Sequence, residues 1–176
     1  MKLVDAAGNE QSELGELMIR SPYVCLGYHN EPEITSQKLV DGWLRTGDVF
    51  LRDPDGFYYF RSRVDDMFSC GGENIYPKEV ENLLFTHPDV VDAVVAPVPH
   101  AVKGFVPAAM VTLRAGATAT PAALKAFCIE RGPLYSHPRH VVLVPALPHN
   151  GAGKIDRAAV RRELQARAVA DAADVS

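Results

Sequence analysis

The sequence predicts an α+β fold in which β-hairpins come first and a compact unit of mixed helices and strands follows. Up to about residue 65, β-prone runs are separated by turn residues such as Pro, Asp and Gly. From about Asp66 onward, apolar stripes at helical spacing alternate with runs of β-branched residues. This change of pattern predicts two domains: residues 1–64 are the end of one domain, and residues 65–176 form a second.

The first region reads as hairpins because its apolar residues alternate with polar ones. The stretch "ELMIRSP" shows this alternation, and "DVFLRDPDGFYYFRSR" places two β-prone runs around a turn. Pro54 presets φ for that turn, and Gly56 tolerates a positive φ. The apolar residues are too few, and the strands too edge-like, to close a core alone. We therefore expect this region to be the last piece of a larger domain.

The second region predicts three helices and three strands. The first helix begins at Pro77, and the second begins at Thr120 as N-cap, with Pro121 next, and ends at Gly132. In the final helix, Val160 and Leu164 point inward. The three predicted strands are "VVDAVVAPV", its neighbour "FVPAAMVTLR", and "HVVLVPAL".

Size, composition and charge exclude several classes of partner. The chain has 176 residues, of which 47% are hydrophobic and 23% charged, which is typical of a globular protein. A net charge of −4 without a basic block argues against nucleic acid as a partner. No apolar run approaches the roughly 20 residues that cross a bilayer, and three scattered cysteines fit a reducing compartment. We therefore expect a cytoplasmic protein without a membrane span.

A carboxylate in the stretch "DGWLRTGDVF" is the first candidate site residue. Thr46, Gly47 and Asp48 form a sharp turn that presents the Asp48 carboxylate. A carboxylate can accept two hydrogen bonds, which suits the two hydroxyls of a ribose. The alternative is an ordinary turn in which the aspartate caps the backbone, since such aspartates are common.

The stretch "RSRVDDMFSCGGENIYPKEVE" holds the second group of candidates. Arg63 could bind a phosphate or a ribose, and Asp65 adjoins the domain boundary. Gly71 and Gly72 allow a ligand to approach the backbone closely, or allow a positive φ. The alternative is a linker, a glycine turn and a helix start, none of which needs a ligand.

A lysine in the stretch "LPHNGAGKIDR" is the third candidate. The stretch is not a phosphate-binding P-loop, because Pro148 stands where that motif needs glycine and Ile155 where it needs a hydroxyl. Lys154 on a mobile glycine loop could instead swing into a site built by another domain and contact an anion. The alternative is an exposed surface lysine. The six histidines show no metal-ligand spacing, so no metal site is predicted.

The order of these stretches resembles the adenylate-forming (AMP-binding) superfamily, which includes acyl-CoA synthetases, beetle luciferases and the adenylation domains of peptide synthetases. The stretches that carry the resemblance are "GELMIRSPYVCLGYHNEPEIT", "GWLRTGD", "DPDGFYYFRSRVDD", "GGENIYPKEVE" and "LPHNGAGKIDR". They cover the chain from about Leu3 to Leu164. The form "GGENIYP" is most similar to acyl- and aryl-CoA ligases, such as chlorobenzoate–CoA ligase and the medium-chain acyl-CoA ligases.

The resemblance implies a fold and a reaction. The fold is a hairpin and partial β-barrel remnant of the large AMP-binding domain, followed by the family's small mobile C-terminal α+β domain. The reaction joins a carboxylic acid to ATP, with Mg²⁺, to give an acyl-adenylate and pyrophosphate. CoA then displaces AMP to give a thioester. Fatty or aromatic acids are the substrates of such ligases.

The family's phosphate loop, adenine-binding strands and acid pocket should precede residue 1. We therefore expect the chain to be the C-terminal third of a ligase that is inactive alone, with an N-terminal fragment as a possible complementing partner. Two alternatives stay open: a stand-alone nucleotide- or CoA-binding or interaction module, and a nonfunctional fragment.

The resemblance also implies roles for individual residues. Asp48 would bind both ribose hydroxyls of ATP and of the acyl-adenylate, Arg63 would contact the same nucleotide, and Phe60 would pack near the ribose. Lys154 would orient the carboxylate and the ATP phosphate during adenylation, which makes it the catalytic residue.

Two further roles concern the change between half-reactions. Asp65 would be the hinge about which the C-terminal domain rotates. Gly71 and Gly72 would line the channel for the pantetheine of CoA after that rotation.

Overall fold

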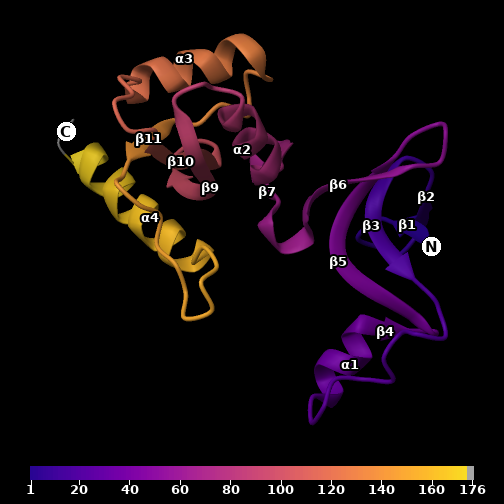
Figure 1. Cartoon of the computed structure of the whole chain (residues 1–176). Coiled ribbons are helices and arrows are strands. Elements are labelled where there is room, and N and C mark those ends of the chain that lie inside the picture. Colours follow the sequence, from indigo (N-terminus) through magenta and orange to yellow (C-terminus); the bar gives the residue numbers. More distant parts are fainter. Residues whose placement is uncertain (174–176) are drawn as a thin grey trace. The chain divides into compact units, whose positions relative to one another are not determined.

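The chain divides into two compact units, Met1–Asp65 and Asp66–Ser176. The computed structural model describes residues 1–173. Figure 1 shows the first unit in indigo to magenta and the second in magenta to yellow. Both contain strands and helices, so the α+β class predicted from the sequence is confirmed.

The first unit is a six-stranded antiparallel sheet around one long strand, β5. Its strands are β1 (Lys2–Val4), β2 (Glu10–Gln11), β3 (Leu14–Ile19), β4 (Leu39–Val40), β5 (Trp43–Arg52) and β6 (Tyr58–Arg63). β5 pairs with β3, β4 and β6, and β3 continues through β1 to β2. The sheet therefore fixes the residues of β5 from several neighbours at once.

The predicted hairpin between β5 and β6 is confirmed. Gly56 has φ +88° and donates its N–H to the carbonyl of Asp53 at 3.0 Å. The side chain of Asp53 accepts the N–H of Phe57 at 2.8 Å. The turn thus follows the chemistry that Pro, Asp and Gly predict.

The sequence prediction missed helix α1 (Pro32–Lys38). It has seven residues and buries none of them, so it has no apolar stripe for a pattern to detect. Local bonds hold it instead: the Thr35 hydroxyl donates to the carbonyl of Glu31 at 2.8 Å and accepts the N–H of Tyr28 at 2.8 Å.

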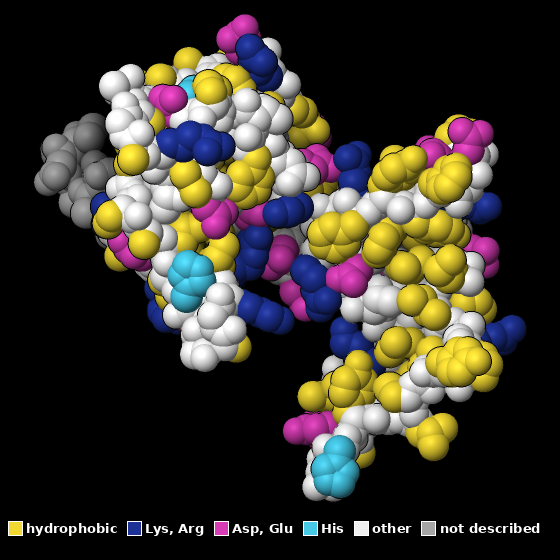
Figure 2. Space-filling model, in the orientation of Figure 1, with side chains coloured by type: hydrophobic (Ala, Val, Ile, Leu, Met, Phe, Trp, Pro, Cys, Tyr) yellow, Lys and Arg dark blue, Asp and Glu magenta, His cyan; other side chains and the backbone are white. Residues whose placement is uncertain are grey.

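The core of the first unit is thin, as its few apolar residues predict. Its buried hydrophobic residues are Leu3, Val4, Leu17 and Met18. Many larger apolar side chains lie on its surface, and Figure 2 shows them gathered over its strands. Those in or beside the strands include Leu14, Val40, Phe57, Tyr59 and Phe60. Exposed apolar patches occur at surfaces that bind proteins, membranes or ligands.

The second unit is built on a five-stranded sheet with three helices. Its elements are β7 (Phe68–Cys70), β8 (Glu73–Ile75), α2 (Pro77–Phe85), β9 (Val90–His100), β10 (Gly104–Leu113), α3 (Pro121–Arg131), β11 (His140–Leu143) and α4 (Arg157–Ala173). β10 pairs antiparallel with β9 and parallel with β11. All three predicted strands and all three predicted helices are present.

The helices pack on this sheet through the residues expected to face inward. α2 and α4 contact β9, and α3 contacts β11 (Figure 1). Val160 and Leu164 of α4 are buried, as predicted. The core cluster lies wholly in the second unit and includes Leu84, Val94, Val98, Val106, Met110 and Leu124.

Helix α3 begins and ends as predicted, but its end has a different cause. The Thr120 hydroxyl accepts the N–H of Ala123 at 3.2 Å, as an N-cap does. Gly132 follows the last helical residue with φ −126°, which any residue can adopt. A Cβ there would lie 2.8 Å from Cδ2 of Leu83 and 3.1 Å from the carbonyl oxygen of Cys128. Close packing, not a left-handed backbone, favours glycine here.

Burial predicts that one of the three cysteines reacts rapidly with a thiol reagent. Cys25 is exposed, whereas Cys70 and Cys128 are buried. Burial also raises the pKa of the Cys128 thiol to about 11, so below that pH the unreactive protonated form dominates. At pH 8, Ellman's reagent should titrate one thiol quickly in the native chain and three in denaturant. The variant Cys25→Ser should lose the fast phase, and two fast native thiols would contradict the prediction.

Candidate functional site

The structure brings two predicted site residues together on the first unit. Asp48 of β5 and Arg63 of β6 are paired across the hairpin. Nη1 of Arg63 donates to Oδ1 of Asp48 at 2.8 Å. Their side chains are 29% and 46% exposed, so both are open to a ligand.

A buried carboxylate holds the backbone that carries Asp48. The sharp turn expected before a strand at Thr46, Gly47 and Asp48 is not formed: the three residues lie inside β5, as a bulge where its register with β3 shifts. The Glu16 residue is only 7% exposed. Its Oε1 accepts the N–H of Gly47 at 3.0 Å, and its Oε2 accepts Nε–H of Arg45 at 2.9 Å. The Thr46 hydroxyl donates to the carbonyl of Leu17 at 2.8 Å and accepts the N–H of Asp48 at 3.1 Å. Strand β3 thus fixes Thr46, Gly47 and Asp48 within β5.

The backbone conformation of Gly47 in β5 favours glycine, because its φ is +74°. A Cβ would lie 3.0 Å from Nη2 of Arg63 and 3.3 Å from Nζ of Lys38. Beside it, a cavity of about 180 Å³ is lined by residues that include Lys38, Arg45 and Asp65. The charged ends of Arg63 and Lys38 therefore lie beside Gly47 in β5.

Stability alone does not explain the Asp48–Arg63 pair. An ion pair this exposed contributes only about 0–1 kcal/mol. The pair instead presents two carboxylate oxygens beside a planar guanidinium with several donors. Such a surface can accept bonds from hydroxyls and donate bonds to phosphate or ribose oxygens. It therefore has the chemistry for a nucleotide.

Phe60 and Asp65 lie on the same unit. Phe60 is half exposed, and its ring packs edge-on against Phe50 with centroids 5.7 Å apart. Asp65 is exposed within a short 3₁₀ helix, Val64–Asp66, where the two units meet in sequence.

Gly71 and Gly72 form the two-residue turn between β7 and β8 in the second unit. Their φ values are +61° and +93°, as in the type I′ turns that close tight hairpins. The N–H of Gly71 donates to the carbonyl of Lys103 at 3.2 Å. A Cβ on Gly72 would meet no heavy atom within 4 Å. Positive φ explains both glycines structurally, and open space remains over Gly72.

Lys154 is exposed on a short hairpin. We call residues 147–156 the lysine hairpin. At its base the N–H of Asp156 donates to the carbonyl of Pro148 at 2.8 Å, and His149 pairs with Ile155. Nearer the tip, the N–H of Asn150 donates to the carbonyl of Lys154 at 2.7 Å.

A second buried carboxylate lies next to the lysine hairpin. Glu81 of α2 is 1% exposed. It accepts the N–H of Val95 at 3.0 Å and Nη2–H of Arg157, the first residue of α4, at 2.8 Å. Burial would lower the pKa of Arg157, but the hydrogen bond and charge of Glu81 outweigh burial and raise it. Glu81 therefore connects three elements and fixes the residue that follows the hairpin.

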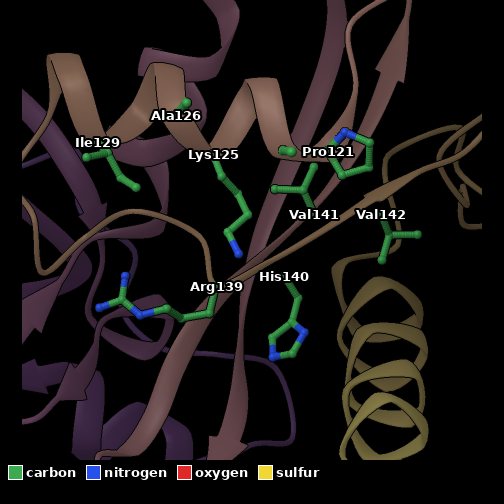
Figure 3. A pocket seen from close by; sticks show the side chains of 9 residues that line it. Pro121, Lys125, Ala126, Ile129, Arg139, His140, Val141 and Val142 are labelled. Atoms are coloured by element: carbon green, nitrogen blue, oxygen red, sulfur yellow. The ribbon is translucent and has the colours of Figure 1, made fainter. Parts of the chain in front are cut away.

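A cavity of about 670 Å³ lies between α3 and β11. In Figure 3 the Lys125 side chain extends from α3 toward the segment that carries Arg139 and His140. Burial lowers the pKa of nearby His137, although the Leu134 carbonyl raises it, and neighbouring cations such as Arg139 lower it further. No predicted site residue lines this cavity.

Sequence reasoning missed the residues that support the site. Glu16 places a carboxylate in an otherwise apolar stretch, and Glu81 shares a helical face with the apolar Val80 and Leu84. Those signals could have marked both as buried acids with partners. Asn150 precedes Gly151 in a turn context, which is typical of a side chain that bonds to its own backbone.

Comparisons with known proteins place this geometry in a family. Residues 79–154 match the family model of the AMP-binding enzyme C-terminal domain. The chain is 44% identical over 153 residues to 2-succinylbenzoate–CoA ligase of Geobacillus kaustophilus, covering 87% of this chain and 30% of that protein. The anthranilate CoA ligase solved with anthranoyl-AMP superimposes with a TM-score of 0.85 at 32% identity, over 96% of this chain and 33% of that one.

The chain belongs to the adenylate-forming superfamily. An amide bond synthetase from Marinactinospora thermotolerans has the same fold, with a TM-score of 0.84 at 37% identity, over 92% of this chain and 33% of that one. The chain thus spans about 30% of the length of the relatives it matches. The family resemblance and the fold predicted from the sequence are both confirmed.

Metal clusters and membrane-spanning helices are both absent from the described residues. Among residues 1–173, no group of three or more His, Cys, Asp or Glu side chains is arranged to hold a metal ion. No helix in that range is long and apolar enough to cross a membrane.

Glu81 should matter for stability far more than a surface glutamate. Glu81→Ala removes the acceptor of the buried Val95 N–H, and an unsatisfied buried donor costs about 1–3 kcal/mol. Urea unfolding should show a loss of this size. Glu163→Ala is the control, because it breaks only the exposed Glu163–Arg167 pair, which is worth about 0.3–0.5 kcal/mol. Equal losses in the two variants would contradict the buried role of Glu81.

Proposed function

We propose that the chain is the C-terminal part of an ATP-dependent acyl- or aryl-CoA ligase and is inactive alone. The single observation that carries the proposal is the Asp48–Arg63 pair, open to solvent on strands β5 and β6 and supported by buried Glu16. The relatives support the same reading, since several are named as CoA ligases for 2-succinylbenzoate, fatty acids and anthranilate. Because those acids differ, only the class of substrate, a carboxylic acid, is assigned.

Asp48 and Arg63 form the part of the nucleotide site that this chain supplies. The Asp48 carboxylate accepts hydrogen bonds from both ribose hydroxyls of ATP and of the acyl-adenylate. Arg63 contacts the same nucleotide through guanidinium donors that Asp48 leaves open. Phe60, half exposed on the same strand as Arg63, provides an apolar surface near the ribose. Mg²⁺ would accompany ATP through phosphate oxygens, and no residue of this chain is assigned to it.

Lys154 acts in the first half-reaction. A carboxylate oxygen of the acid attacks the α-phosphorus of ATP, a new P–O bond forms, and the bond to pyrophosphate breaks. Negative charge crowds the reacting atoms, and the Lys154 ammonium stabilises it while holding the carboxylate and the phosphate in line. The exposure of Lys154 at a hairpin tip supports this role.

The second half-reaction uses another face of the same unit. The CoA thiol attacks the acyl carbonyl, AMP leaves with the electron pair of the cleaved C–O bond, and a thioester forms. Gly71 and Gly72 line the channel for pantetheine, which the open space over Gly72 allows. Asp65, exposed where the two units meet in sequence, is the hinge for the change between half-reactions.

The exposed apolar side chains of the first unit provide the surface for the rest of the ligase. Figure 2 shows them over the strands of that unit. We propose that an upstream part of the enzyme covers them, either in one polypeptide or as a complementing fragment. An ATP–pyrophosphate exchange assay with a panel of acids tests this: no exchange with the chain alone, and exchange with the upstream part added. The alternative, a binding or interaction module, predicts no exchange in either case.

Lys154→Ala should impair one half-reaction and spare the other. In the complemented enzyme we expect adenylation to fall roughly 100-fold or more, the size of effect seen when one charge-stabilising donor is removed. Thioester formation from supplied acyl-adenylate should keep most of its rate. Lys125→Ala, which removes a lysine of α3 outside the proposed site, is the control and should change neither rate. Equal loss in both half-reactions would rule out the assigned role of Lys154.

Asp48→Asn should weaken nucleotide binding in both half-reactions. The amide keeps the size of the side chain but loses the charge, and a hydrogen bond to a charged group contributes about 1.5–3 kcal/mol. Calorimetric titration of the complemented enzyme with AMP should show a Kd raised by roughly 10-fold or more. Asp55→Asn, in the exposed β5–β6 turn, is the matched control. An unchanged Kd for Asp48→Asn would refute the ribose contact.

A further inference from the structure

We propose that Asn150 is a positioning residue for Lys154, holding the backbone of the lysine in one conformation. This inference rests on the proposed role of Lys154, and it assigns a function to a side chain that touches no reacting atom.

Four hydrogen bonds converge on Asn150. Its Oδ1 accepts the N–H of Ala152 at 3.0 Å and the N–H of Lys154 at 3.1 Å. Its backbone N–H donates to the carbonyl of Lys154 at 2.7 Å, and its carbonyl accepts the N–H of Gly153 at 2.9 Å. Both peptide groups that flank the Cα of Lys154 are therefore bonded to Asn150. The Lys154 side chain therefore starts from a backbone that is hydrogen-bonded on both sides.

Asparagine is well suited to this task. Its short side chain places an amide oxygen where it can accept N–H groups from residues two and four positions later. Gly153 completes the turn with φ +73°, and a Cβ there would meet nothing within 4 Å, so conformation alone accounts for that glycine. Gly153 thus shapes the bend, while Asn150 closes it around Lys154.

The base of the lysine hairpin connects this arrangement to the core. Leu147 is buried, and Ile155 packs against the same hydrophobic cluster. Asp156 accepts the N–H of Ala159 at 2.9 Å and so caps α4, the helix that follows the hairpin. Arg157, bonded to buried Glu81, lies three residues after Lys154. The hairpin is therefore continuous with the packed body of the second unit.

Holding the backbone of Lys154 in one conformation has a kinetic consequence. A lysine whose backbone is fixed enters the nucleotide site in the orientation that aligns the reactants, and a misplacement of about 1 Å can cost roughly 100-fold in rate. Loss of Asn150 should therefore lower the rate of adenylation with little effect on the binding of ATP. If Asn150 only supported the fold, its loss would lower the stability of the chain and would affect both half-reactions alike.

Amide exchange measured by NMR on the full chain tests the hold on Lys154 directly. In Asn150→Ala, the amides of Ala152 and Lys154 should exchange roughly 10-fold faster or more, since both lose their acceptor. Asn150→Asp keeps an acceptor oxygen and should retain slow exchange. Asn74→Ala, which changes an exposed asparagine of another hairpin, is the control. Wild-type exchange rates in Asn150→Ala would overturn the proposal.

The two half-reactions of the complemented enzyme test the consequence. In Asn150→Ala we expect kcat for adenylation to fall roughly 10-fold or more, while KM for ATP and the rate of thioester formation stay within about twofold. Asn150→Ser, which keeps an uncharged acceptor, should recover part of the rate. Equal loss in both half-reactions, or a rise in KM alone, would overturn the positioning role. If Lys154→Ala leaves adenylation intact, the proposed function fails instead, and the exchange rates still report whether Asn150 holds the backbone.

Discussion

A buried carboxylate, Glu81, is the constraint on which the arrangement of the second unit depends. It satisfies the N–H of Val95 in β9 and pairs with Arg157, while Lys78 of its own helix lies 3.5 Å away. A charge removed from water is tolerated only with such partners. Through these bonds Glu81 joins α2, β9 and the first residue of α4. The start of the helix that follows Lys154 is therefore fixed to the sheet.

The first unit uses the same device. Glu16 is buried, pairs with Arg45 and accepts the N–H of Gly47. In both units the residues proposed to meet substrate, Asp48 and Lys154, are accessible, whereas the carboxylates that support them are not. Groups that meet a substrate need this combination: the side chains are exposed, and the backbone that carries them is held by buried partners.

Much of the local structure could be predicted because its causes lie within a few residues. The turn at Asp53 to Gly56 and the helix start at Thr120 depend on side chains that bond to their own backbone. Helix α1 escaped prediction because it buries no residue and therefore has no periodic signal. The glycines of the lysine hairpin gave no sign of the two hydrogen bonds that the Asn150 side chain accepts from Ala152 and Lys154.

The sequence by itself determined the α+β class, the change of pattern near residue 65, most strands and helices, and the candidate residues Asp48, Arg63 and Lys154, because periodicity and turn chemistry act over short distances. Only the tertiary structure decided that Asp48 meets Arg63 across a hairpin, and that Glu81 meets Arg157 from 76 positions away. Such contacts arise only when distant segments pack. A carboxylate needs hydrogen-bond partners because it is buried, and burial exists only once the chain is folded.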